Sequence, residues 1–296
     1  MTIRPLTSRR QLTAQRFSQN DGGDWELELP AYYVRLFETT FPRIRSKAVE
    51  GFRILRGESQ IARLRELTIR EIELIQKFIT WYQRSICIST NKHLDGVFFD
   101  ELDFCLALDK NYPEPGQERT EIGEWEYQAK YKHDDAAAKK LASEMVRAIR
   151  SVQSFANAPR LLSYVPSSSS NKFYLPAEIA SLVLADPSVA RLLTTEGELL
   201  LVPTLTVDKQ EAKSMKVSEK IVQWQNLIAE DRIRLSRDIR GHSVIVLDDL
   251  YQSGATLWSY AKFLKSHHAV SVIGLVCVKS LRDSDNRSDA PVGSTP

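Results

Sequence analysis

The segment from Val244 to Thr256 constrains the fold of this chain more than any other stretch. Its sequence is Val-Ile-Val-Leu-Asp-Asp-Leu-Tyr-Gln-Ser-Gly-Ala-Thr. The four apolar residues from Val244 to Leu247 are β-prone and predict a buried strand that ends at two adjacent carboxylates. A loop with glycine and small hydroxyl residues follows, and a helical pattern then runs to about His267. This order of strand, loop and helix is typical of an α/β fold.

Other apolar segments predict further strands of the same sheet. Leu161–Val165 and Leu199–Val202 are each followed by proline, and a helical stretch from about Pro176 to Leu184 lies between them. A strand, a helix and a second strand argue for a parallel sheet. Val270–Val278 predicts one more strand. The predicted fold is therefore α/β, with a mostly parallel sheet flanked by helices.

Three regions divide the chain. We predict that residues 1–95 form a helical N-terminal extension, whose clearest helix starts at Thr68, because Thr68 and Glu71 have capping-box spacing. Residues 96–282 are expected to form the α/β domain, although its polar segment 208–240 shows no strand signal. Residues 283–296 are polar and are predicted to be a disordered tail.

Charge and composition exclude several classes of protein. The 296 residues contain 40 Lys and Arg against 38 Asp and Glu, and this near-zero net charge excludes a polybasic nucleic-acid binder. A local excess at 43–70, eight Arg and Lys against three Glu, fits either a solvated helix surface or a nucleic-acid face. No apolar run approaches the ~20 residues of a transmembrane helix, and no secretory signal is present. We therefore expect a cytoplasmic protein that makes no membrane contact.

The residues after the predicted strand suit a phosphorylated sugar. Backbone N–H groups of 252–256 would lie at a helix N-terminus, where they can surround a phosphate, and Gly254 would let the backbone approach it closely. Ser253 and Thr256 add hydroxyl donors. Asp248 and Asp249 can accept hydrogen bonds from ribose hydroxyls and can attract Mg²⁺. The alternative is a plain strand–loop–helix in which the Asp pair caps the helix. A Walker A loop is excluded, because no Gly-Lys-Ser/Thr is present.

This run resembles the motif that binds phosphoribosyl pyrophosphate (PRPP) in type I phosphoribosyltransferases. That motif is a strand followed by Asp-Asp or Glu-Asp, two variable residues and Thr-Thr-Gly-x-Thr or a close variant. The resemblance implies a type I phosphoribosyltransferase-like fold, catalytic Asp248 and Asp249 at the ribose, and a Mg²⁺ cofactor that this pair holds largely through the ligand. The residues that it implies around the 5-phosphate are Gln252, Ser253, Gly254, Ala255 and Thr256. Purine-type members carry an acid at the position of Gln252, and a glutamine cannot do that acid/base work.

Other segments resemble the ComF-like branch of this family. Residues 122–135, with Lys130-Tyr131, look like its Lys-Tyr segment, and 201–220 look like the hood segment before the motif strand. Residues 164–172 look like its Val-Pro strand and basic loop, so Ser167, Ser168 and Lys172 are implied to face pyrophosphate. Two family features are missing, an N-terminal four-Cys zinc module and an Arg-Gly-Phe-Asn-Gln stretch.

Two functions follow from these patterns. The first is an enzyme that transfers phosphoribose to a nitrogenous acceptor and releases pyrophosphate, in nucleotide metabolism. The second is a non-catalytic, ComF-like sensor of PRPP or a nucleotide, with a DNA or protein partner bound through the N-terminal region, in DNA uptake or DNA metabolism. The acceptor and the oligomeric state, including a homodimer, are left open.

Overall fold

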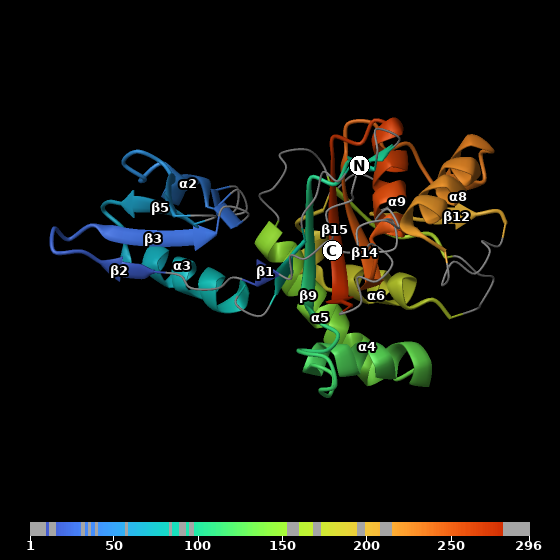
Figure 1. Cartoon of the computed structure of the whole chain (residues 1–296), viewed down its shortest axis with the longest axis horizontal. Helices are drawn as coiled ribbons and strands as arrows, with labels where there is room; N and C mark the ends of the chain where they lie inside the picture. Colours follow the sequence, from blue (N-terminus) through green and yellow to red (C-terminus); the bar gives the residue numbers. More distant parts are fainter. Residues whose placement is uncertain are drawn as a thin grey trace, which may run out of the picture.

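The two largest sheets of the protein are a central sheet and a smaller N-terminal sheet (Figure 1). The computed structural model describes residues 10–11, 16–30, 33–34, 37–38, 41–56, 59–82, 85–88, 93–94, 98–152, 160–167, 173–193, 199–207 and 215–280. None of the helices within these ranges is long and apolar enough to cross a membrane.

The central sheet has seven strands in the order β1-β6-β9-β15-β14-β10-β11. Its last five strands are parallel to one another, and β6 and β1 extend it in antiparallel fashion. The bounds are β1 Arg10–Gln11, β6 Ile86–Cys87, β9 Phe104–Lys110, β10 Arg160–Tyr164, β11 Leu200–Leu201, β14 Ser243–Tyr251 and β15 Ser271–Lys279. The α/β fold with a mostly parallel sheet is therefore confirmed.

Helices cover both faces of this sheet, because its inner strands are apolar on both sides. Along β14, Ile245 and Leu247 point to one core and Val244 and Val246 to the other. A strand buried on both faces carries a continuous apolar run, which is the pattern seen in the sequence. The first core packs against α4 (Glu121–Lys132), α5 (Asp135–Val152), α6 (Leu175–Leu184) and α7 (Pro187–Ala190). The second packs against α8 (Val217–Ala229) and α9 (Ala255–Ser266).

Short elements complete this part of the chain. A two-stranded antiparallel pair joins β12 (Pro203–Leu205) to β13 (Ile233–Leu235), and a second pair joins β7 (His93–Leu94) to β8 (Phe98–Phe99). The segment 208–240 thus contains a strand that its polar sequence did not predict. Only Ile233 of β13 is fully buried, so the strand depends on its pairing with β12 more than on its own apolar pattern.

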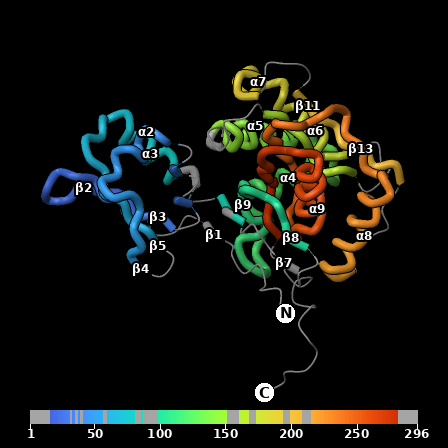
Figure 2. The backbone as a smooth tube through the Cα atoms, turned by 90° about the horizontal axis from the view of Figure 1, so that it is seen from above, coloured from blue at the N-terminus to red at the C-terminus, as the bar shows by residue number. Residues whose placement is uncertain are grey.

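The prediction of a helical N-terminal extension was wrong. Four strands between residues 17 and 64 form an antiparallel sheet in the order β2-β3-β5-β4, beside the central α/β part (Figures 1 and 2). Its strands are β2 Phe17–Gln19, β3 Trp25–Pro30, β4 Arg53–Arg56 and β5 Ser59–Leu64, with the short helix α2 at Pro42–Arg45. In β3, Leu27 and Leu29 are buried while Glu26 and Glu28 alternate with them. This alternation of apolar and polar residues has the period of a strand.

The helix predicted at Thr68 is confirmed as α3 (Ile69–Tyr82). The Thr68 backbone N–H donates to Oε2 of Glu71 at 2.8 Å, and the Glu71 N–H donates to the Thr68 hydroxyl at 3.3 Å. Both halves of the capping box are therefore formed.

Four of the eight basic residues of 43–70 form ion pairs with acids. Four ion pairs are Arg45–Glu38, Lys47–Glu71, Arg53–Glu50 and Arg65–Asp24, at 3.4, 2.8, 2.7 and 3.2 Å. Such pairing favours a solvated protein surface over a nucleic-acid face. A partner of the N-terminal region stays a prediction. So does the domain boundary at residue 95, although β1 and β6, which precede it, pair into the central sheet. Residues 283–296 lie outside the described residues.

Candidate functional site

The predicted loop lies where the direction of the chain connections reverses in the central sheet. From β10 the chain passes through α6 to β11, whereas from β14 it passes through α9 to β15, on the opposite side. Strands β10 and β14 are neighbours, and α6 and α9 lie on opposite faces. Open α/β sheets bind ligands at the carboxyl ends of strands beside such a reversal. The loop after β14 therefore has the position of a ligand site.

Gly254 shapes the loop that opens α9. Its φ of +86° lies in the left-handed region, and it is the N-cap residue of the helix. Behind it pack the buried rings of Tyr251 and Trp258, whose indole N–H donates to the tyrosine hydroxyl at 2.8 Å. The backbone N–H groups of the first helical turn cannot bond within the helix, so they remain available to an anion. The loop thus has the features of a phosphate-binding helix N-terminus.

The other loop residues predicted from the motif lie beside Gly254. Ser253 and Ala255 are buried, and Gln252 and Thr256 are partly exposed. The Ser253 hydroxyl accepts a long hydrogen bond of 3.4 Å from the Ala255 N–H, which leaves most of its hydrogen-bonding capacity unused by this contact. The five predicted residues therefore form the loop after β14 and the first two residues of α9.

Asp248 and Asp249 lie at the end of β14, as predicted. The Asp249 N–H donates to Oδ1 of Asp248 at 2.9 Å. Asp248 is partly exposed, and Asp249 is buried. The pKa of Asp248 is raised well above its ordinary value. The larger cause is that the surrounding protein removes water from its carboxylate, and the second is the nearby Asp249 carboxylate. Two close carboxylates of this kind favour a ligand that brings hydroxyl donors or positive charge.

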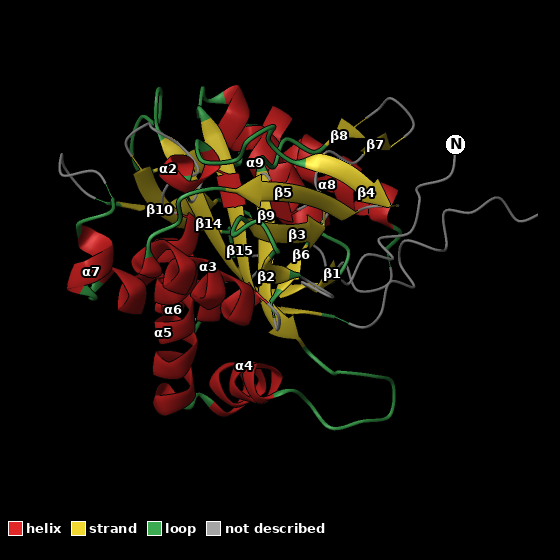
Figure 3. Cartoon of the chain, turned by 90° about the vertical axis from the view of Figure 1, so that its left-hand side faces the viewer, coloured by secondary structure: helices red, strands yellow, loops and turns green. Residues whose placement is uncertain are grey.

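Lys130 ties helix α4 to this pair. Its ammonium lies 2.8 Å from Oδ2 of Asp249 and 3.5 Å from Oε1 of Glu126, one turn earlier on the helix. Figures 1 and 3 show α4 across the lower end of the central sheet, the end at which β15 finishes. Burial raises the pKa of Glu126 to about 7, and the Lys130 ammonium offsets part of that effect. Despite its own burial, the two carboxylates raise the pKa of Lys130.

Besides Lys130, three further residues at the site were not predicted as site residues. Glu126 is the first, and Tyr174 and Lys279 are the others. The Tyr174 hydroxyl donates to the Val165 carbonyl at 3.0 Å, and its pKa is raised by burial and then by the charges of Asp248 and Asp249. Lys279 is 2% exposed, and its ammonium lies 3.0 Å from the Ser280 carbonyl and 3.5 Å from that of Gln252. In the sequence, the only sign of the role of Lys279 was its position as a charged residue at the end of an apolar strand.

The segment implied to face pyrophosphate is only partly described. Val165 bonds through its N–H to the Leu247 carbonyl at 3.0 Å, so the end of β10 is fixed beside Asp248. Ser167 follows two residues later and is partly exposed. Ser168 and Lys172 lie outside the described residues.

The donor set fits a divalent metal only in part. Within the described residues, no group of three or more His, Cys, Asp or Glu side chains is arranged to hold an ion. Asp248 uses one oxygen on the Asp249 N–H, and Asp249 is ion-paired with Lys130. The pair therefore fits Mg²⁺ as a supplement to oxygen ligands that a bound phosphorylated sugar brings, because Mg²⁺ is commonly held by few carboxylates together with substrate phosphates.

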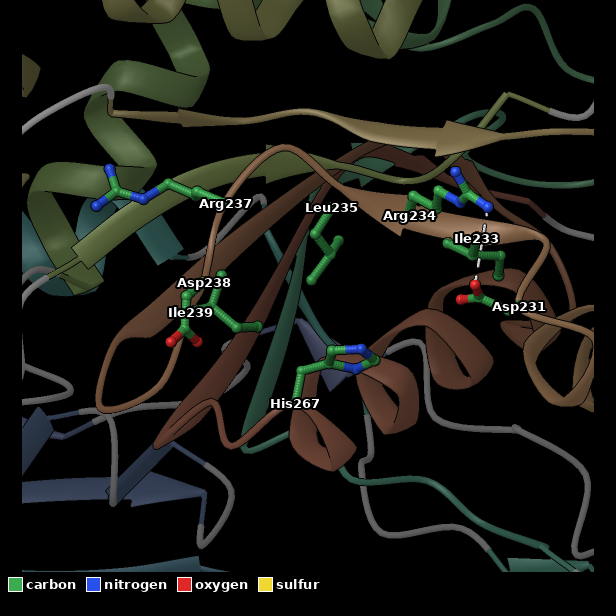
Figure 4. A pocket seen from close by; sticks show the side chains of 8 residues that line it. All are labelled: Asp231, Ile233, Arg234, Leu235, Arg237, Asp238, Ile239 and His267. Carbon is green, nitrogen blue, oxygen red and sulfur yellow. Dashed lines mark ion pairs between the residues drawn. The ribbon is translucent and has the colours of Figure 1, made fainter.

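A separate pocket of about 290 Å³ lies away from the motif. Arg234, Arg237, Asp238 and His267 contribute to its lining (Figure 4). Because His267 is the C-cap of α9 and Gly254 is its N-cap, the pocket and the loop lie at opposite ends of the same helix. The candidate site is therefore distinct from this pocket.

Comparison with known proteins yields similarities of structure only. No protein-family model and no curated protein matches the chain. It is similar to a hypoxanthine phosphoribosyltransferase from Staphylococcus aureus, with 12% identity, a TM-score of 0.29 and coverage of 49% of this chain and 74% of that one. It is also similar to that from Trypanosoma cruzi in complex with the product IMP, with 11% identity, a TM-score of 0.29 and coverage of 53% and 71%. At these values the similarity assigns no activity.

Proposed function

We propose that this chain binds PRPP, or a related ribose 5-phosphate ligand, at the end of β14. The observation that carries the proposal is the combination of Asp248, Asp249 and the Gly254 turn at the reversal point of a parallel sheet. Carboxylates accept hydrogen bonds from ribose hydroxyls, and the free N–H groups of a helix N-terminus bind phosphate. Both features occur within nine residues of one connection, Asp248 to Thr256.

Different residues would bind different parts of the ligand. Asp248 and Asp249 would accept from the ribose hydroxyls and fix the sugar. The turn 252–256 would hold the 5-phosphate through backbone N–H groups and the hydroxyls of Ser253 and Thr256. Ser167, Ser168 and Lys172 would face the pyrophosphate. A Mg²⁺ ion bound with the ligand supplies charge neutralisation of the pyrophosphate.

Transfer would then follow from positioning. A nitrogenous acceptor attacks C1 of the ribose, the C1–O bond to pyrophosphate breaks, and pyrophosphate leaves with the bonding electrons. Fixed hydrogen-bond donors and a constrained geometry supply most of the rate in chemistry of this kind. The chain would contribute orientation of the sugar and neutralisation of the leaving group.

Isothermal titration calorimetry with PRPP and Mg²⁺ tests the proposal. The natural chain is compared with the variant Asp248→Asn/Asp249→Asn and with a control, Asp231→Asn. Asp231 lies at the distant pocket and has an 81% exposed side chain. We expect binding to the natural chain and the control, and a loss of at least about tenfold for the double variant, since hydrogen bonds to charged groups contribute about 1.5–3 kcal/mol each. Equal binding by all three proteins contradicts the proposed site.

A second candidate is ligand binding without transfer. Gln252 favours it, because an amide cannot serve as the acid that purine-type members carry at this position. Release of pyrophosphate in the presence of nitrogenous bases and amines separates the two functions. Binding of PRPP with no release for any acceptor favours a sensor, whereas release that requires Asp248 and Asp249 favours the enzyme.

A further inference from the structure

The carboxylate assigned to the ribose is already occupied by a side chain of the protein. The Lys130 ammonium lies 2.8 Å from Oδ2 of Asp249, within the range of a charge-assisted hydrogen bond. The side chain of Asp249 is only 12% exposed. A ribose hydroxyl can therefore bond fully to this oxygen only after the ammonium has moved away from it.

Glu126 offers the ammonium a second position. Its Oε1 lies 3.5 Å from Lys130 Nζ, and its side chain is 5% exposed. Within the described residues this buried oxygen makes no hydrogen bond. A buried carboxylate oxygen without a hydrogen bond is costly, so a small movement of the ammonium toward Glu126 would be stabilising.

The two contacts lie on one short path. Glu126 and Lys130 are one turn apart on α4, so both can face the end of β14. The Lys130 side chain is 30% exposed, which leaves it room to move between the two carboxylates. Asp249 lies on a different element, at the end of β14, and 12% of its side-chain surface remains exposed.

We propose that Lys130 is a positioning residue that neutralises Asp249 in the ligand-free protein and transfers to Glu126 when ribose hydroxyls bind Asp249. This inference rests on the proposed function. It explains why a buried acid with one oxygen that makes no hydrogen bond lies beside the motif, since Glu126 is the acceptor that the ammonium needs in the bound state. In both states the ammonium keeps a carboxylate partner, and Asp249 keeps a donor.

The substitution Glu126→Gln should change ligand affinity in the direction opposite to the one that simple electrostatics predicts. Glu126→Gln removes a negative charge near a site for a highly anionic ligand, so unspecific attraction would strengthen binding. Under the proposal the same change weakens binding, because the displaced ammonium loses its charged partner.

The experiment is calorimetric titration of PRPP and Mg²⁺ into four proteins at fixed salt and about pH 8.5, where Glu126, whose pKa is about 7, is charged. They are the natural chain, Glu126→Gln, Glu126→Gln/Lys130→Met and the control Glu124→Gln. Glu124 is on the same helix, and its side chain, 45% exposed, contacts Arg119 and Gln128. We expect Glu126→Gln to bind about tenfold more weakly, equivalent to about 1.4 kcal/mol. The control should lie within about twofold of the natural chain, and the double variant, which keeps the natural net charge, should lose less affinity than Glu126→Gln alone.

The other outcomes overturn either the transfer of Lys130 or the proposed function. Unchanged or tighter binding by Glu126→Gln, with binding by the natural chain intact, overturns the transfer alone. An equal loss in the double variant shows that Glu126 acts without Lys130, and it also overturns the transfer. Absence of PRPP binding by the natural chain overturns the proposed function and this inference with it.

If thermal unfolding shows that Glu126→Gln is not folded, a second pair of variants tests the transfer of Lys130. Lys130→Met is compared with Lys132→Met, an exposed lysine of the same helix. An ammonium that competes for Asp249 predicts that Lys130→Met binds PRPP no more weakly than Lys132→Met. An ammonium that contacts the ligand directly predicts a loss of about tenfold or more, since charge-assisted hydrogen bonds are strong, and that result overturns the proposal.

Discussion

Replacement of Gly254 by alanine tests the packing behind the candidate phosphate loop. The added Cβ would lie 2.6 Å from Cε2 of Trp258 and closer still to the hydroxyl of Tyr251. Both rings are almost fully buried, at 2% and 1% exposure, and they share a hydrogen bond of 2.8 Å. The backbone at Gly254 has φ +86°, where an L-residue is strained. The substitution therefore combines backbone strain with a collision that no flexible side-chain end can relieve.

The loss of stability can be built from its parts. Left-handed backbone costs an alanine about 1–2 kcal/mol. Displacement of two buried rings costs about 1–3 kcal/mol as overpacking, and the lost hydrogen bond adds about 1–2 kcal/mol. We expect a decrease of about 3–7 kcal/mol in the free energy of unfolding, a large fraction of the total for a typical domain.

Urea unfolding followed by circular dichroism measures this decrease, and Gly241→Ala is the matched control. Gly241 has φ +79°, but a Cβ there meets no atom within 4 Å. The control should lose only the backbone part, about 1–2 kcal/mol. Equal losses in the two variants would refute the argument from packing, because backbone strain is the only cost they share.

Three further predictions concern other contacts. The first compares the free energy of unfolding of Glu126→Gln with that of the natural chain, measured in urea at each pH. As the pH rises from about 4 to about 8, this difference should shift by about 3 kcal/mol in favour of the variant. Burial raises the pKa of Glu126 from 4.5 to about 7, so the natural chain is favoured most below pH 4.5 and loses that contribution as the pH rises through 7; a constant difference contradicts this. Thr68→Ala should destabilise the chain by about 1 kcal/mol in thermal unfolding, because it breaks the capping box with Glu71, and an unchanged Tm speaks against that cap. Tyr260→Phe should cost about 1–2 kcal/mol in urea unfolding, because its hydroxyl is buried 2.9 Å from that of Ser163; a neutral effect shows that this bond contributes nothing net.

The central sheet was predictable because its strands carry their own signals. Val244–Leu247 and Val270–Val278 are apolar runs, and both proved to be strands buried on two faces. The helical stretch expected from about Pro176 to Leu184 is α6. A strand that is buried on both faces is apolar along its length, so it can be recognised without knowing which strands or helices it packs against.

The N-terminal sheet was missed because local preferences conflict with its pairing. Leu27, Leu29, Glu26 and Glu28 are residue types that favour helices. Their alternation favours a strand, and pairing with β5 some 35 residues further on decides the matter. Strand propensity depends on packing against partners more than helix propensity does, so this region could not be read from local preference alone.

The amino-acid sequence alone determined the motif and its local form. Val244 to Leu247 make a strand, and Gly254 permits the turn that opens α9, through interactions between near neighbours. The tertiary structure alone decided what surrounds the motif. Lys130 meets Asp249 across 119 residues of chain, and Glu126 is buried beside them, because α4 packs across the end of the sheet. Contacts of this range depend on how whole elements pack, and residue spacing in the sequence carries no record of them.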